Sequence, residues 1–74
     1  MPATALSVLD LSVLNDGQSS GDALRTTAAL AQAADRLGYT RFWVAEHHNM
    51  PSVACTSQTV LMAHLAATTQ HMRV

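Results

Sequence analysis

Four consecutive polar or titratable side chains follow a short apolar run in the middle of the chain. They are Glu46, His47, His48 and Asn49, and they come directly after residues 42–45, which read FWVA. A histidine titrates near pH ~6.5, so it can take or give a proton at cellular pH, and an adjacent carboxylate can orient it or stabilise its charge. The triplet of Glu46, His47 and His48 is therefore our main candidate for acid/base chemistry. The alternative is a polar loop in which one histidine hydrogen-bonds the backbone.

The other metal-binding or nucleophilic side chains do not form a second constellation. Adjacent residues of an extended segment point to opposite sides, so His47 and His48 are not expected to bind one ion together. If His64 and His71 lay on one helix they would be about 10 Å apart. Cys55 has no basic neighbour in the sequence to lower its pKa, which favours a packed thiol over a nucleophile. We expect no metal site, and we expect His64 in a core or an interface.

The elements that would position the triplet alternate between strand and helix. Residues 6–11 are rich in aliphatic side chains and suit a buried strand. A second set of residues recurs at helical spacing: Ala23, Leu24, Thr27, Leu30, Ala31, Ala34 and Leu37. Ser19, Ser20 or Asp22 could cap that helix, and Gly38 stands where a left-handed terminating residue is expected. The expected bounds are about 6–11 for the first strand, 22–37 for the first helix, 41–45 for the second strand, 57–69 for the second helix, and 72–74 for the start of a third strand.

The spacing of these elements favours one α/β architecture over another. Leu6 to Phe42 and Phe42 to Met72 are separations close to the roughly 31 residues per unit of an eightfold (β/α)₈, or TIM, barrel. A doubly wound dinucleotide fold has the same element order, but it needs a Gly-x-Gly-x-x-Gly turn after its first strand. That loop offers only Gly17 and Gly21. We therefore predict the N-terminal two units, and the start of a third, of a TIM barrel.

Composition limits the classes of partner and compartment. The chain has 74 residues, four Lys or Arg against five Asp or Glu, and a net charge of −1, which offers no basic surface for nucleic acid or for an anionic membrane. One cysteine can close no internal disulfide, which fits a reducing compartment. No apolar run approaches the length of a membrane span or of a signal-peptide core. We expect a cytoplasmic protein that binds neither nucleic acid nor membrane.

A chain of this length cannot close a barrel. Parallel strands are normally covered on both faces and paired along both edges, and most of those partners are missing here. The charged residues, at 12%, are also too few to coat a small independent sphere. We expect a fragment, or a chain that must associate; the alternative is a compact two-layer mini-domain.

The stretch from Leu37 to Pro51, LGYTRFWVAEHHNMP, resembles the bacterial luciferase-like, flavin-dependent monooxygenases. The similarity spans nearly the whole chain. Residues 6–12 look like the first barrel strand of that family, residues 23–37 like its first helix, and residues 60–74 like its second helix and the beginning of its third strand. The Glu-His-His sequence after Trp-Val-Ala is a fairly specific sign of this family, whereas alanine-rich helices occur in many families.

The resemblance implies a (β/α)₈ barrel that binds reduced flavin mononucleotide (FMN), reacts it with oxygen to a C4a-peroxyflavin, and oxygenates a small organic substrate. It implies that His47 is the acid/base, that Glu46 and His48 shape the pocket, and that Leu11 and Ser12 border the flavin. The deazaflavin F420 of some relatives is the less favoured cofactor. The resemblance also implies a separate reductase that supplies the reduced FMN, and a homodimeric parent.

Two functions of different classes remain open from the sequence. The first is an enzyme-derived chain, the N-terminal part of such a monooxygenase, which is inactive alone and binds no flavin tightly; a truncated reading frame with no role is a further possibility beside the two functions. The second is a small interaction module that pairs with itself or with a complementary barrel fragment and catalyses nothing.

Overall fold

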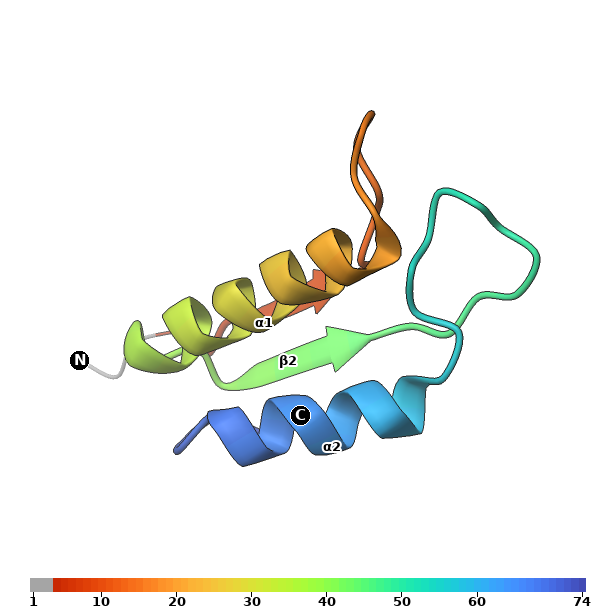
Figure 1. The fold of residues 1–74 in the computed structure, drawn as a ribbon. Coiled ribbons are helices and arrows are strands. Elements are labelled where there is room, and N and C mark those ends of the chain that lie inside the picture. The colour runs from red at the N-terminus through yellow and green to blue at the C-terminus, as the bar shows by residue number, and fades with distance from the viewer. Residues whose placement is uncertain (1–3) are drawn as a thin grey trace.

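A computed structural model describes residues 4–74 and shows a small α/β arrangement of two strands and two helices. The order along the chain is β1 (Ser7–Asp10), α1 (Ser20–Arg36), β2 (Arg41–Val44) and α2 (Gln58–Thr68). The expectation of an α/β chain is confirmed. Figure 1 shows α1 and α2 running alongside the strands, with the loops that follow β1 and β2 at the same end.

The two strands are parallel, and Leu9 lies opposite Trp43 in their register. The chain returns to the other edge of β2 near its C-terminus: Phe42 donates its backbone N–H to the carbonyl of Arg73 at 2.8 Å, and Arg73 donates to Thr40 at 3.1 Å. The segment around Arg73 forms an isolated parallel bridge with Arg41 and is not a full strand. The sequence order of the three extended segments is thus also their spatial order.

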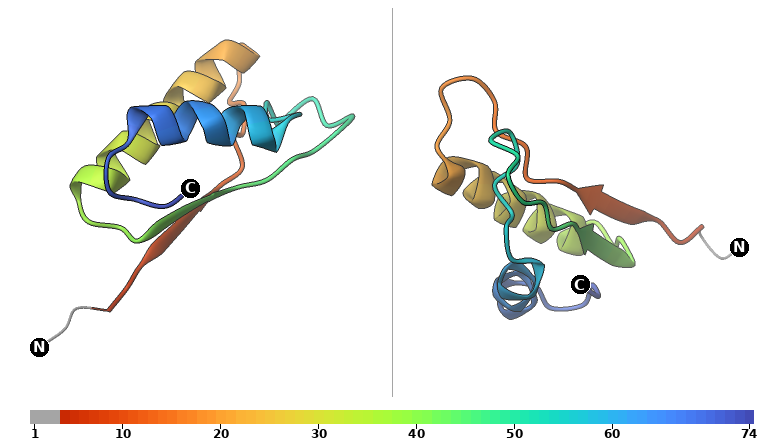
Figure 2. Two further views of the ribbon diagram at one scale, coloured as in Figure 1. Left: turned by 90° about the horizontal axis from the view of Figure 1, so that it is seen from below. Right: turned by 90° about the vertical axis from the view of Figure 1, so that its right-hand side faces the viewer.

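Both helices lie on one side of the sheet, as the two views in Figure 2 show. Side chains alternate across a strand, so Phe42 is 1% exposed beneath the helices while Trp43 is 58% exposed on the other side. The residues that form the core are Ala31, Ala34, Phe42, Cys55, Leu61, Leu65 and Met72. Truncating a buried aromatic such as Phe42 to alanine typically costs about 3–5 kcal/mol, so we expect this layer to contribute strongly to stability.

Helix α1 begins two residues before the expected position because its cap is Ser19. The Ser19 hydroxyl accepts from the backbone N–H of Asp22 at 3.1 Å, and the Asp22 carboxylate accepts from the N–H of Ser19 at 3.0 Å. This reciprocal pair satisfies two amides that the first helical turn leaves unpaired. The helix ends at Arg36, one residue before the expected end, and Gly38 follows with a φ of +86°, the left-handed conformation that glycine adopts without steric cost.

The remaining elements are slightly shorter than their expected ranges. Strand β1 is Ser7–Asp10 within the expected 6–11, β2 is Arg41–Val44 within 41–45, and α2 is Gln58–Thr68 within 57–69. At the end of β1, Ser12 takes a φ of +52°, a conformation incompatible with continued strand pairing. No helix among residues 4–74 is long and apolar enough to span a membrane.

Candidate functional site

The loops that follow the two strands are held together by backbone pairing. Val13 and Val53 form an antiparallel bridge, and the backbone N–H of Leu14 donates to the carbonyl of Ser52 at 2.8 Å. The loop after β1 and the loop after the Glu-His-His triplet therefore form one surface at the carboxyl end of the sheet. Figure 1 shows this end at the right of the molecule. In parallel α/β folds, ligands bind at this end of the strands.

Glu46 is fixed by two contacts. One of its carboxylate oxygens, Oε1, accepts from the backbone N–H of Gln58 at 2.9 Å, and Oε2 lies 3.1 Å from Nε2 of His48. The N-cap residue of α2, Ser57, makes no side-chain cap bond, and the first turn of α2 carries no acidic residue. Glu46 thus takes over, from twelve positions earlier in the chain, the part that a capping side chain normally plays.

His48 is largely exposed and directs Nε2 at two oxygens. Besides the Glu46 carboxylate, Nε2 lies 3.2 Å from the backbone carbonyl of Thr56. A carboxylate and a carbonyl are both acceptors, so this geometry assigns the hydrogen to Nε2 whether or not the ring is charged. His48 joins Glu46 to the segment before α2, which is a positioning arrangement within the loop.

His47 differs from both neighbours. It is half-buried, and its ring atom Nδ1 is buried without a hydrogen-bond partner among the described residues. Its backbone N–H donates to the carbonyl of Cys55 at 3.0 Å, which closes the loop between the two residues. An unpaired buried polar atom costs about 1–3 kcal/mol, so a bound water, ion or ligand, or a catalytic role, has to account for it. Of the triplet, His47 is the residue with unused bonding capacity.

The two residues at the end of β1 are oriented differently from each other. Leu11 is 38% exposed, whereas Ser12 is 3% exposed. The Ser12 hydroxyl lies 2.7 Å from the hydroxyl of Thr27 on α1, its N–H donates to Asp10, and its carbonyl accepts from Ala54. The polar atoms of Ser12 are therefore engaged within the protein, and only Leu11 presents an open side chain at this position.

Sequence reasoning missed Asp10 and Thr27. The hydroxyl of Thr27 donates to Oδ2 of Asp10 at 2.6 Å and also contacts Ser12. The signal was an acidic residue that closes an aliphatic strand and a threonine at an apolar position of the helix. Each is unremarkable alone, and only the packing of α1 on β1 brings them together.

The environment of Cys55 supports a packed thiol. The side chain belongs to the core, and burial raises the pKa of the Cys55 thiol against the opposing effect of the Ser57 backbone N–H, with the carboxylate of Glu46 adding to the increase. Both influences disfavour the thiolate, which is the nucleophilic form. Within residues 4–74, no group of three or more His, Cys, Asp or Glu side chains is placed to hold a metal ion.

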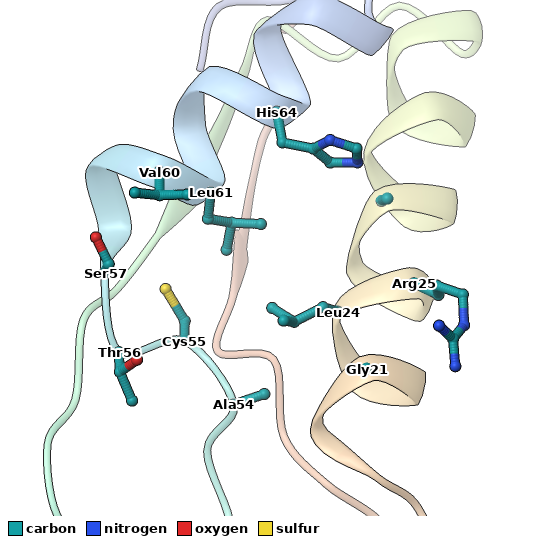
Figure 3. A pocket seen from close by; sticks show the side chains of 11 residues that line it. Gly21, Leu24, Arg25, Ala54, Cys55, Thr56, Ser57, Val60, Leu61 and His64 are labelled. Atoms are coloured by element: carbon teal, nitrogen blue, oxygen red, sulfur yellow. The ribbon is translucent and has the colours of Figure 1, made fainter.

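A cavity of about 530 Å³ opens between α1, α2 and residues 54–57, which precede α2. Its lining is largely apolar: in Figure 3, Leu24 of α1 and Leu61 of α2 point toward each other, and His64 points toward α1. His64 is exposed at this margin and is not buried in the core. None of Glu46, His47 and His48 lines this cavity. The cavity and the triplet share the segment before α2, where Cys55 accepts the N–H of His47 and Thr56 contacts His48.

Comparison with known proteins places this arrangement in a family. The family model described as luciferase-like monooxygenase matches residues 4–74. The chain is 46% identical over 69 residues to the N-acetyl-S-alkylcysteine monooxygenase of Bacillus subtilis strain 168, covering 93% of the chain and 21% of that relative. It is 43% identical over 65 residues to a luciferase-like monooxygenase of Escherichia coli K12, covering 88% of the chain and 19% of that relative.

A solved structure agrees with the sequence comparison. The crystal structure of apo-MsnO8 superposes with a TM-score of 0.93 at 40% identity, and the match covers 97% of this chain and 22% of that one. The chain spans about a fifth of the length of the curated relatives that it matches. Sequence and structure together show that the chain belongs to the luciferase-like monooxygenase family.

Proposed function

We propose that this chain forms the first two βα units, and the start of the third strand, of a (β/α)₈ barrel in a flavin-dependent monooxygenase. The spatial order of the extended segments supports the barrel, because each new parallel segment is added beside the previous one. The uncovered face supports it as well: Leu9 and Trp43, paired in register, are 66% and 58% exposed. In a closed barrel this face would become the packed interior.

The family-length protein, meaning these residues continued by the rest of the barrel, would use reduced FMN and molecular oxygen to oxygenate a small organic substrate. Reduced flavin supplies the electrons that activate oxygen. We favour FMN over F420 as the cofactor, with a separate reductase as the source of reduced FMN. We also favour a homodimer and a cytoplasmic location. The Bacillus relative is named for N-acetyl-S-alkylcysteine, which contains a thioether. An alkyl thioether is therefore a suitable first substrate to test.

The observation that carries the proposal is the unpartnered Nδ1 of His47. A half-buried imidazole at the carboxyl end of β2, with the exposed Leu11 following the end of β1, fits an aromatic ligand that needs a proton donor or acceptor. His47 would hold or move a proton at its imidazole ring, while Glu46 and His48 keep the loop and the start of α2 in place. Leu11 would contact the flavin through its side chain, and Ser12 would only set the backbone there.

The test uses the family-length protein with reduced FMN, oxygen and an N-acetyl-S-alkylcysteine. His47→Ala should lower product formation, measured as gain of one oxygen atom by mass spectrometry, by about 10² to 10⁴ fold. His71→Ala is the matched control, because His71 lies beside Asp35 at the other end of the molecule. Unchanged turnover in His47→Ala would remove His47 from the mechanism.

The isolated chain provides a second test. Most of the ligand-binding loops of a barrel come from strands that are absent from these residues, so the 74-residue chain should bind FMN only weakly when titrated by flavin fluorescence. Tight binding would contradict the assignment of these residues as an incomplete site.

The exposed pair Leu9 and Trp43 also favours a second candidate, an interaction module without catalysis. A chain of that kind would bury this face against a second copy or a complementary barrel fragment. It predicts a discrete oligomer on a sizing column for the 74-residue chain, whereas an unfolded monomer or an unspecific aggregate would reject it.

A further inference from the structure

Thr27 lies in the middle of α1, is 2% exposed, and uses its hydroxyl twice. The hydroxyl donates to Oδ2 of Asp10 at 2.6 Å, and it lies 2.7 Å from the hydroxyl of Ser12. Because the single hydrogen of Thr27 goes to the carboxylate, the Ser12 hydroxyl must donate to Thr27. The three side chains form a directed chain of hydrogen bonds from the end of β1 into the helix.

The same chain of contacts continues through the backbone to His47. Ser12, held at a φ of +52°, presents its carbonyl to the N–H of Ala54 at 2.9 Å. The next residue, Cys55, accepts at its carbonyl the N–H of His47 at 3.0 Å. Hydrogen bonds, linked by the covalent backbone of Ser12 and of residues 54–55, therefore lead from a helix on the outer face of the sheet to the backbone of the candidate acid/base.

We propose that Thr27 is a positioning residue for His47, acting through Ser12 and the 54–55 backbone; this inference rests on the function proposed above for His47. A valine would fill the volume of Thr27 equally well, so packing alone does not call for a hydroxyl at this buried position. The left-handed Ser12 is a conformation that non-glycine residues adopt rarely, and it needs support from its surroundings. The Thr27 hydroxyl adds to the support that Asp10 gives through the N–H of Ser12, and so helps to fix where the neighbouring loop places His47.

The first test needs no cofactor and no turnover. In the family-length protein, Thr27→Val removes the hydroxyl and keeps the shape, so the amide of His47 should exchange with deuterium about tenfold faster. Thr27→Ser keeps the hydroxyl and should restore protection. Thr26→Val is the matched control, since the Thr26 hydroxyl bonds only to the carbonyl of Asp22 on the exposed side of the same helix.

The second test asks whether Thr27 acts through His47. Thr27→Val should lower turnover about tenfold with a smaller change in KM, because a misplaced acid/base affects the chemical step more than binding. In a double-mutant cycle, Thr27→Val combined with His47→Ala should be no slower than His47→Ala alone. Where Thr27→Val does not fold, Ser12→Ala removes the hydroxyl that donates to Thr27 and should give the same pattern.

The outcomes separate this inference from the function on which it rests. Two results together support positioning: faster exchange of the His47 amide in Thr27→Val, and a double mutant that loses no more turnover than His47→Ala alone. Unchanged exchange at His47 in Thr27→Val overturns it, as do losses that multiply in the double mutant. If His47→Ala alone keeps full turnover, the proposed function fails, and the positioning role in catalysis fails with it even where exchange at His47 responds to Thr27→Val.

Discussion

The carboxylate of Glu46 accepts the backbone N–H of Gln58 at 2.9 Å, and this bond joins the end of β2 to the first residue of α2. The residue that the sequence offers as a charged partner for a histidine is thus also the cap of a helix. The first turn of a helix leaves its amides unpaired and carries a partial positive charge, so a carboxylate is the best side chain to meet it.

Replacing Glu46 by alanine should therefore lower the stability of the fold, because α2 loses its cap. We expect Glu46→Ala to reduce the free energy of unfolding of the family-length protein by about 1 kcal/mol, measured by urea denaturation. Glu46→Gln keeps an acceptor for Gln58 and should lose less. Asp16→Asn removes a surface carboxylate outside α2 and is the charge-matched control. Equal stability of Glu46→Ala and wild type would show that water caps α2 equally well.

We expect Asp35, at the opposite end of the sheet, to make the stability of the protein depend on acid pH. Its carboxylate accepts the backbone N–H groups of Gln70, His71 and Met72 at 2.8, 2.9 and 2.9 Å, and these bonds hold the pKa of Asp35 below its ordinary value of 3.8. Because the pKa is lowered in the folded state, the stabilisation is complete above the unfolded value. It is lost as the pH falls through the folded pKa.

Asp35→Asn should consequently flatten the loss of stability below about pH 4, measured by urea denaturation across a pH series. The variant should be less stable than wild type at neutral pH, and the two curves should converge in acid. Asp16→Asn should leave the steepness of the acid limb nearly unchanged. Parallel curves for Asp35→Asn and wild type would show that the three hydrogen bonds to Asp35 do not cause the loss of stability in acid.

Trp43 reports directly on closure of the barrel. It is the one tryptophan of the sequence and is 58% exposed on the uncovered face. Acrylamide should quench its fluorescence strongly in the 74-residue chain. In a family-length protein whose other tryptophans are replaced by phenylalanine, quenching should be weak and the emission should move to shorter wavelength. Equal quenching in both proteins would contradict a closed barrel.

His48 should matter less than His47. Its imidazole is largely exposed, and exposed ion pairs contribute about 0–1 kcal/mol, so His48→Ala should cost no more than that in urea denaturation. Because Nε2 is engaged by Glu46 and Thr56, we expect turnover of His48→Ala to fall much less than that of His47→Ala under the same assay. A larger loss for His48→Ala would exchange the roles assigned to the two histidines.

The local features of this chain could be predicted from short stretches of sequence. The apolar spacing after Asp22 indicated α1, Gly38 marked its end, and the Trp-Val-Ala run before Glu46 indicated a strand with polar residues at its carboxyl end. Each depends on neighbours within a few positions, because helical periodicity, capping and backbone freedom are properties of local chain geometry. The same stretch also carried the family resemblance.

The division of work among the site residues was decided only by tertiary structure. Nothing in the sequence indicated that Glu46 caps α2, that His48 contacts Thr56, or that Thr27 reaches Asp10 and Ser12. These contacts join residues 8 to 17 positions apart, and their geometry depends on how each helix packs on the sheet. A hydrogen bond is sensitive to tenths of an ångström and to angle, whereas a residue pattern specifies only which face of an element is buried.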